Sequence, residues 1–523
     1  MNIKKGIWLL LCMLIISMFP FSVGLAAPQS AEAKQTAWDG VIIETEGFDR
    51  PEALSDASRT TYTKAEEQNR ILISSEEGVY GIYIEFDRIS EEWQLNDCAT
   101  GESFSCGENG FLHAYTDVVS LTGEHLQEAE LVFAPGTVIA DIYVVQSPEI
   151  PSFVQNWQVP YEEADLLLVS SHSDDEQLFF AGLLPLYAGE KQLRVQVAYV
   201  VQHFEAQGVQ NHVRGHEQLD GLWTVGVRNY PFISEFPDLY AESKNRETAF
   251  AQAVKVFEDA GVTYEDFVVY LTEAIRKCRP QVVVSHDFDG EYGHGTHVVC
   301  ASALQEAIAA AEDETYHSES ANAYGTWSVK KAYSHLYPEN TIRMDYDTPL
   351  AFWNGKTAFE VTQEGFACHK SQHWTWFYAW IYGKDGAPVT KASQINRYSP
   401  CDYGLYHTLV GNDVIGGDFM ENIVSYEEQY RIAAEEALRL QEEERLKQEA
   451  IRLQEEAEKK AEEIAGELAE LQQNMQTVSA NLRQENQKRK LLLAGGIGLT
   501  IVVSAAVLIY MSKRKFINFR GAK

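Results

Sequence analysis

Residues 166–176 read Leu-Leu-Leu-Val-Ser-Ser-His-Ser-Asp-Asp-Glu, an apolar run that ends in a cluster of polar side chains. The run Leu166–Val169 is short and continuously apolar, which is typical of a parallel strand buried on both faces. Further along, the run Val282–Val284 has the same character and also precedes a polar cluster. Because open parallel sheets bind ligands beyond the carboxyl ends of their strands, we expect the two clusters to share one site.

The residues around these two strands alternate between strand patterns and helix patterns. A third strand is predicted over 195–201, and helices are predicted over 176–188, 247–260, 264–278 and 294–311. Strands that alternate with helices predict an α/β domain with a mainly parallel sheet. We place this domain at residues 160–424, with an aromatic-rich extension over 313–424.

Both polar clusters contain the residue types that bind a catalytic metal. The second cluster runs from His286 to His297 and reads His-Asp-Phe-Asp-Gly-Glu-Tyr-Gly-His-Gly-Thr-His. Imidazole and carboxylate are ligands of Zn²⁺, and a catalytic zinc keeps three protein ligands and an open position. Of the adjacent Asp174 and Asp175, one can bind metal while the other accepts a proton. Each cluster alone also fits a plain helix cap, so it is the combination that favours a site.

These clusters resemble the signatures of a known family. His-Ser-Asp-Asp-Glu at 172–176 resembles the His-Pro-Asp-Asp-Glu of the LmbE-like, or PIG-L, N-acetylglucosaminyl deacetylases. Gly-Glu-Tyr-Gly-His-Gly-Thr-His at 290–297 is similar to that family's second signature, which usually ends in His-Pro-Asp-His. Arg214 and Glu217 resemble its Arg-x-x-Glu. Order and spacing agree over about residues 165–312, and the resemblance implies a Rossmann-like fold and zinc.

The resemblance also implies a role for each matching residue. The metal ligands would be His172, Asp175 and His297. Asp174 would be the general base, and Tyr292 and His294 would stabilise the oxyanion or assist the leaving amine. Arg214 would contact the substrate. A water activated by Asp174 would attack an acetamide carbonyl and release acetate and an amine.

The sequence departs from the family at two positions inside these signatures. Ser173 stands where the family usually has Pro, which removes rigidity but no ligand. Thr296 stands where the family has Asp, which leaves open how His294 is supported.

The region before the α/β domain reads as β structure. Residues 38–159 show alternating apolar residues and turn signals, which predict a β-sandwich. Carbohydrate binding and a plain structural role are both open for it. Cys98 and Cys106 flank a short turn and are the expected pair if disulfides form, with free thiols as the alternative.

The two ends of the chain predict a membrane location. Residues 1–27 have the charged, apolar and small-residue order of a signal peptide, and 491–511 form an uncharged apolar run followed by a basic tail at 512–523. Residues 426–488 carry a heptad seam, which predicts a coiled-coil stalk that forms a homodimer or, alternatively, a single solvated helix. The expected protein is a single-pass plasma-membrane protein with its catalytic domain outside a Gram-positive bacterial cell.

Charge and motifs together lead to one functional hypothesis. The net charge of −35 argues against a nucleic-acid partner, because phosphate binding needs clustered Lys and Arg. The leading hypothesis is a zinc-dependent hydrolase that removes acetyl groups from N-acetylglucosamine-type units of a cell-surface or cell-wall glycan. The alternatives are hydrolysis of another amide by the same chemistry and an inactive wall-binding anchor protein. Five of the ten Trp residues lie in 313–424, where aromatic rings could bind sugar or form a core.

Overall fold

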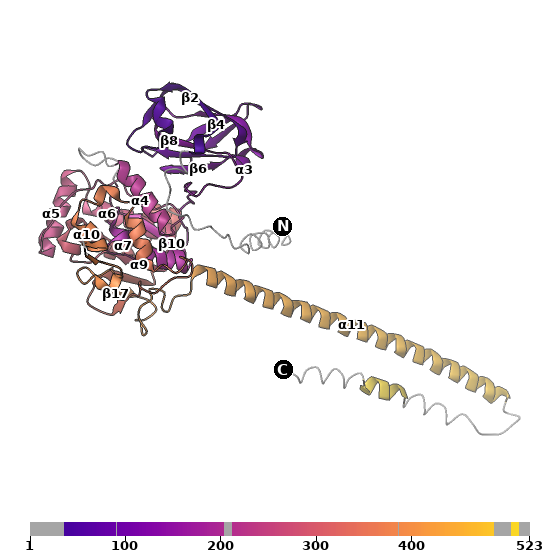
Figure 1. Cartoon of the computed structure of the whole chain (residues 1–523). Helices are drawn as coiled ribbons and strands as arrows, with labels where there is room; N and C mark the ends of the chain where they lie inside the picture. The colour runs from indigo at the N-terminus through magenta and orange to yellow at the C-terminus, as the bar shows by residue number, and fades with distance from the viewer. Residues whose placement is uncertain (1–35, 90, 203–211, 385, 486–503, 512–523) are drawn as a thin grey trace. The chain divides into compact units, whose positions relative to one another are not determined.

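The computed structural model describes residues 36–89, 91–202, 212–384, 386–485 and 504–511 (Figure 1). Residues up to Gln429 form one compact unit, and residues from Tyr430 onward form a second. The predicted signal peptide at 1–27 and the predicted basic tail at 512–523 lie outside the described residues.

The N-terminal part of the first unit is an antiparallel β region, drawn in indigo and violet in Figure 1. Seven strands are hydrogen-bonded in the order β5-β4-β7-β2-β8-β3-β6, and the eighth strand, β1, pairs with β2. The strands are β1 Val41–Phe48, β2 Thr63–Val79, β3 Gly81–Phe86, β4 Trp93–Asp97, β5 Ser103–Cys106, β6 His113–Asp117, β7 Leu126–Val132 and β8 Val138–Val145. The alternating burial along β1 and β4 matches the period of a strand with one buried face. Predicted β structure is therefore present, while its arrangement as a sandwich stays a prediction.

The predicted disulfide in this β region is wrong. Cys98 lies exposed in the turn after β4, whereas Cys106 is buried at the end of β5, opposite Trp93. The two side chains thus have different environments, and both thiols are free. Burial raises the pKa of the Cys106 thiol to about 11, which keeps it protonated and unreactive at neutral pH.

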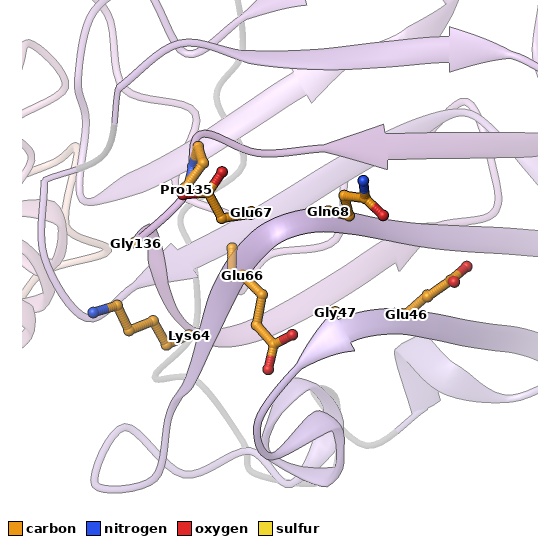
Figure 2. Close-up of a pocket in the computed structure, with 9 residues that line it drawn as sticks. Glu46, Gly47, Lys64, Glu66, Glu67, Gln68, Pro135 and Gly136 are labelled. Carbon is orange, nitrogen blue, oxygen red and sulfur yellow. The ribbon is translucent and has the colours of Figure 1, made fainter.

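A hollow in the β region lies beside β2 and the turn at Pro135 and Gly136 (Figure 2). Its volume is about 850 Å³, and most of the residues that line it are polar or small, including Glu46, Lys64 and Glu66. None of the lining residues is aromatic, so this hollow lacks the flat ring faces that sugars stack on. Carbohydrate binding by this region stays a prediction.

The C-terminal part of the first unit is built on a seven-stranded sheet in the order β11-β10-β9-β12-β13-β17-β14. The five strands from β11 to β13 are parallel, and β17 runs antiparallel to both of its neighbours. The strands are β9 Leu166–Ser170, β10 Val195–Tyr199, β11 Phe232–Ile233, β12 Val282–Ser285, β13 Lys331–His335, β14 Thr341–Arg343 and β17 Asp402–Thr408. The predicted α/β class is confirmed; the finer description as Rossmann-like stays a prediction.

Apolar side chains cover both faces of this sheet. Leu167 and Val169 of β9 belong to the cluster that packs against α5, α6 and α7, whereas Leu166 and Leu168 belong to the cluster on the other face. This two-faced burial explains why the strand is apolar without interruption. The helices are α4 His212–Thr224, α5 Arg246–Asp259, α6 Tyr264–Cys278, α7 Gly295–Glu312, α8 Ser318–Tyr324, α9 Ala358–Phe366 and α10 Trp376–Tyr382.

Three of the four predicted helices are present, and the one predicted over 176–188 is wrong. Residues Asp175–Gln177 form one 3₁₀ turn, and Pro185–Glu190 form a π-helical turn. Between them, Gly182 has a φ of +94°, and a Cβ on this residue would lie 2.3 Å from the Tyr346 ring. The backbone therefore leaves the helical region at a glycine that no other residue could replace without a clash.

The sheet order places the two polar clusters next to each other. β9 lies between β10 and β12. The chain passes from β9 to β10 and β11 on one side, and then crosses to β12 and β13 on the other side. Such a reversal opens a crevice beyond the carboxyl ends of the strands. Both signatures begin at those ends, directly after β9 and directly after β12.

The predicted extension at 313–424 is integral to this sheet, because it contributes β13, β14 and β17. Its aromatic residues divide into two groups. Trp353 is buried in the core, whereas Trp374 and Trp376 have exposed fractions of 84% and 47%.

The C-terminal helix α11 runs over Tyr426–Glu485, so the predicted helix is present, while its role as a stalk stays a prediction (Figure 1). Apolar residues of the heptad seam, such as Leu453, Ile464 and Leu471, are each about half exposed. Pairing of this helix with a second copy stays a prediction.

The predicted plasma-membrane location is contradicted. Within the described residues, no helix is both long enough and apolar enough to cross a membrane. Most of the predicted span at 491–511 falls on residues outside the described part of the structure. The predicted location outside the cell, which depended on the signal peptide at 1–27 together with this span, is withdrawn with it.

Candidate metal centre and active site

The loop after β9 is held in an unusual conformation by its own carboxylates. Asp174 has a φ of +106°, which is rare for a residue with a side chain. Its backbone N–H donates to Glu176 Oε2 at 2.9 Å, and the backbone N–H of His172 donates to Asp175 Oδ2 at 2.8 Å. Asp174 stands at the N-cap position of the following turn, yet its side chain makes no capping hydrogen bond. The Asp174 carboxylate is therefore available for another role.

The second cluster lies in the loop between β12 and α7. The 3₁₀ turn Glu291–Gly293 brings the chain to His294, which caps α7, and His297 follows within the first turn of this helix. Gly293 has a φ of +86°, and a Cβ here would lie 2.2 Å from the carbonyl oxygen of Ser243. Both histidines are buried and point toward the loop after β9, as their ring contacts with His172 show.

Both predicted histidine ligands approach the carboxylate of the third, Asp175, but His172, Asp175 and His297 do not themselves form one of the groups whose ligand atoms all lie close together. His172 Nδ1 lies 3.2 Å from Asp175 Oδ2, and His297 Nε2 lies 3.4 Å from the same atom. Two overlapping groups have ligand atoms within 4.8 Å of one another: His172, His294 and His297, and Asp175, His286 and His297. His297 belongs to both groups, so a metal bound by either group would have His297 as a ligand.

Hydrogen bonds distinguish the histidines that are free to bind a metal from those that are committed. His286 Nε2 accepts the backbone N–H of Ser171 at 2.9 Å, so its lone pair is already used. His297 donates its Nδ1–H to Glu291 Oε2 at 2.6 Å, which leaves the lone pair on Nε2. That Nε2 atom is buried and makes no hydrogen bond. A carboxylate behind a histidine is the usual support of a metal ligand, so the residues present fit a divalent metal.

Electrostatics separate the two adjacent aspartates. Burial raises the pKa of Asp174 to about 7, although the Arg214 guanidinium, with NH2 3.7 Å from Oδ1, acts in the opposite direction. Burial also acts to raise the pKa of Asp175, but His297 and His286 outweigh it and hold this pKa well below its ordinary value. Asp175 is thus the anionic ligand type, and Asp174 can take and release a proton near neutral pH.

His294 is a neutral hydrogen-bond donor in this site. Its Nδ1 accepts the backbone N–H of Thr296 at 3.3 Å, which places the proton on Nε2. Burial holds the pKa of His294 well below its ordinary value. A backbone N–H therefore fixes the tautomer of His294 here. Tyr292, at a φ of +51°, packs its ring centroid 5.5 Å from that of His294.

Arg214 reaches the same loop from α4. Its NH2 donates to the carbonyl oxygen of Ser173 at 2.7 Å, and its NH1 donates to Asp238 Oδ2 at 3.2 Å. Asp238 Oδ1 in turn lies 3.5 Å from His172 Nε2. Contact of Arg214 with a substrate stays a prediction. Glu217, three residues on, accepts from the backbone N–H and the hydroxyl of Ser371.

Several residues of the site carry no role in the sequence analysis. Glu291 and His286 lie within the second polar cluster, but nothing in the pattern marks their contacts. His335 ends β13, one strand beyond β12, and donates Nδ1–H to Glu291 Oε1 at 2.7 Å. The strand that carries His335 reads Lys-Ala-Tyr-Ser-His, which is not a continuous apolar run, so no local pattern marked it as a strand that ends at the site. Asp238 lies in a stretch without a motif.

Comparison with known proteins agrees with this geometry. Residues 167–308 match the family described as PIG-L: GlcNAc-PI de-N-acetylase. Two curated relatives are 1D-myo-inositol 2-acetamido-2-deoxy-alpha-D-glucopyranoside deacetylases. The one from Geodermatophilus obscurus is 26% identical over 199 residues, which cover 36% of this chain and 66% of the relative. The one from Kineococcus radiotolerans is 26% identical over 196 residues, which cover 34% and 53%.

Among solved structures, N,N'-diacetylchitobiose deacetylase from Pyrococcus horikoshii is similar to 48% of this chain and 89% of its own. The sequence identity is 15% and the TM-score is 0.31, values too low to bear on function. The curated relatives are matched over between about half and two thirds of their length. The chain therefore carries a PIG-L (LmbE-like) domain at residues 167–308, as the two signatures predicted.

Proposed function

We propose that the PIG-L domain of this chain is a metal-dependent N-deacetylase that acts on N-acetylglucosamine-type sugar units. The observation that carries the proposal is the convergence of His172 Nδ1 and His297 Nε2 on Asp175 Oδ2, with the Asp174 carboxylate beside them and uncommitted to a helix cap. Zinc is the metal we propose, because its catalytic sites combine His and Asp ligands with an open position.

Each residue of the site would take a part that its contacts allow. A bound divalent metal supplies a Lewis acid that polarises the amide carbonyl and acidifies water. Asp174, with a pKa of about 7, would accept the proton of the attacking water. His294 would donate its Nε2–H to the oxygen that becomes negative, with Tyr292 beside it. The C–N bond then breaks, and the proton held by Asp174 passes to the leaving amine as acetate forms.

The reaction is tested by measuring acetate release from a panel of amides. The panel holds N-acetylglucosamine, its oligomers, an N-acetylglucosaminyl inositol, an acetylated cell-wall glycan and acetylated peptides. We expect release from the sugars alone, its loss after treatment with a chelator and its return when Zn²⁺ is added. Release from peptides alone would support hydrolysis of another amide, and no release from any compound would support an inactive domain. Either result would contradict the proposal.

The cell-wall glycan keeps its place in the panel as one arm of the test. Its choice depended on a location outside the cell, which is withdrawn. The proposal therefore stands at the level of an N-acetylated sugar, and the panel decides which acceptor carries it.

Exposed aromatic rings beside the metal centre favour a sugar substrate over a peptide. The Tyr292 ring, next to His294, meets the ring of Trp376 on α10 at 5.9 Å between centroids, and Trp376 is 47% exposed. The ring of Tyr240, which is 65% exposed, also packs against His294, with 5.2 Å between the two ring centroids. Flat apolar faces with a few polar groups are typical of sites that hold a ring-shaped ligand.

Trp376→Ala is expected to raise KM for an N-acetylglucosamine oligomer about 3- to 10-fold and to change kcat little. The loss corresponds to about 1 kcal/mol of ring contact. Tyr378→Ala is the matched control, because this residue is similarly exposed on the same helix but packs against His373 and Tyr382. Steady-state kinetics of both variants check the prediction. Equal effects of the two substitutions would remove Trp376 from the substrate site.

A further inference from the structure

We infer that Glu291 is the positioning residue that aligns both halves of the metal centre, and that His335 is its buried charge partner. Glu291 lies in the loop after β12, and His335 ends β13, beyond the residues that match the PIG-L family. The inference rests on the proposed function only in that the site binds a divalent metal. It concerns which residues of this chain hold the ligands in place.

Glu291 accepts four hydrogen bonds and is fully buried. Its Oε2 accepts Nδ1–H of His297 at 2.6 Å and Nδ1–H of His286 at 2.8 Å. Its Oε1 accepts Nδ1–H of His335 at 2.7 Å and the backbone N–H of Asp287 at 3.1 Å. A carboxylate can accept at all four positions, whereas an amide in its place would turn two of them into donors.

Through two of these contacts Glu291 reaches both polar clusters. The bond to His297 fixes the ring so that its Nε2 lone pair faces Asp175. The bond to His286 fixes the other ring so that its Nε2 accepts the backbone N–H of Ser171, the residue before His172. The Glu291 carboxylate thus orients the His297 ring on α7 directly. It holds the loop after β9 in place indirectly, through the His286 ring.

His335 supplies the positive charge that this buried carboxylate requires. Its Nδ1 faces Glu291 Oε1 at 2.7 Å, and its Nε2 faces the carbonyl oxygen of Ser399 at 2.9 Å. A carbonyl and a carboxylate can only accept, so both ring nitrogens donate and the ring is an imidazolium. Both side chains are fully buried, where an unpaired charge would be costly. The extension beyond the family match therefore takes part in the metal centre.

Glu291→Gln is expected to weaken Zn²⁺ binding about 10- to 100-fold. In either orientation the amide N–H₂ would face two donors, the two rings now on Oε2 or the His335 ring and the Asp287 N–H now on Oε1. The affinity is measured by competition with a chelator, at a temperature where circular dichroism shows the variant folded. Glu85→Gln is the matched control, since Glu85 is a fully buried carboxylate on β3 with its own partner, Arg59. This control is expected to lose stability and to keep wild-type affinity for Zn²⁺.

His335→Gln is the second variant, and it tests the inference if Glu291→Gln does not fold. It keeps one donor for Glu291 and removes the positive charge, so we expect Zn²⁺ binding to weaken about tenfold. Wild-type affinity in the folded Glu291 variant, or in the His335 variant if that alone folds, would overturn the inference. A loss no greater than that of Glu85→Gln would overturn it as well. A wild-type chain that binds no Zn²⁺ would instead overturn the proposed function.

Discussion

Asp174→Asn is expected to lower the rate of acetate release about 10²- to 10⁴-fold, the usual cost of losing a general base. Asn keeps the size of the side chain and tolerates the positive φ of this position, so the loop should keep its shape. Metal content should stay at the wild-type value, because Asp175 and both histidine ligands remain. Acetate release and bound zinc are measured on the same preparation.

The alternative for Asp174 is a purely structural helix cap, and the same variant separates the two. Asn caps a helix about as well as Asp does, so a capping role would leave activity intact. The structure already argues against capping, because the Asp174 side chain makes no such hydrogen bond. A fully active Asp174→Asn protein would remove this residue from the chemistry.

His297→Ala is expected to abolish both metal binding and acetate release. His297 is common to both groups of ligand atoms, and its Nε2 is the buried nitrogen that makes no hydrogen bond. Removing a first ligand leaves too few groups to hold a catalytic metal. Metal analysis of the purified variant, together with the acetate assay, checks both losses.

His294→Ala is the matched control for His297→Ala, since His294 is equally buried one turn away. We expect this variant to lose activity but to keep its zinc, because His294 is a donor to the substrate oxygen in our account. Zinc retained by His297→Ala, or lost equally from both variants, would show that the ligand set is wrong.

The sequence was sufficient for the parts of the fold where one pattern dominates. β9 and β12 are apolar without interruption because both faces of the sheet are covered, and α6 keeps its predicted bounds because Thr263 and Asp266 form a capping box at its start. The two signatures were found because each follows directly on such a strand.

Other parts could not be predicted because distant residues decide them. The helix expected over 176–188 fails at Gly182, whose φ is +94° and where any side chain would clash with the Tyr346 ring. His335 enters the site only because β13 pairs with β12, a pairing that no local pattern reveals. The contact of Asp238 with His172 and Arg214 likewise joins segments that are far apart in the sequence.

The predicted location at the membrane is the part of the hypothesis that is contradicted. It depended on the uncharged apolar run at 491–511 with the basic tail after it, and on the predicted signal peptide. Among the described residues no helix meets the length and apolarity that a span requires. The glycan outside the cell was inferred from the predicted signal peptide and span together, so this part of the functional hypothesis lost its support, whereas the metal chemistry did not depend on it.

The most direct test of the central claim is anomalous X-ray diffraction at the zinc edge from crystals of this protein grown with Zn²⁺. We expect one strong peak about 2.0–2.2 Å from nitrogens of His172 and His297 and from an oxygen of Asp175. Asp174 would lie beside the peak without binding it, and Glu291 would lie behind His297. A peak held by His286 in place of His172, or no peak between the two signatures, would contradict the account.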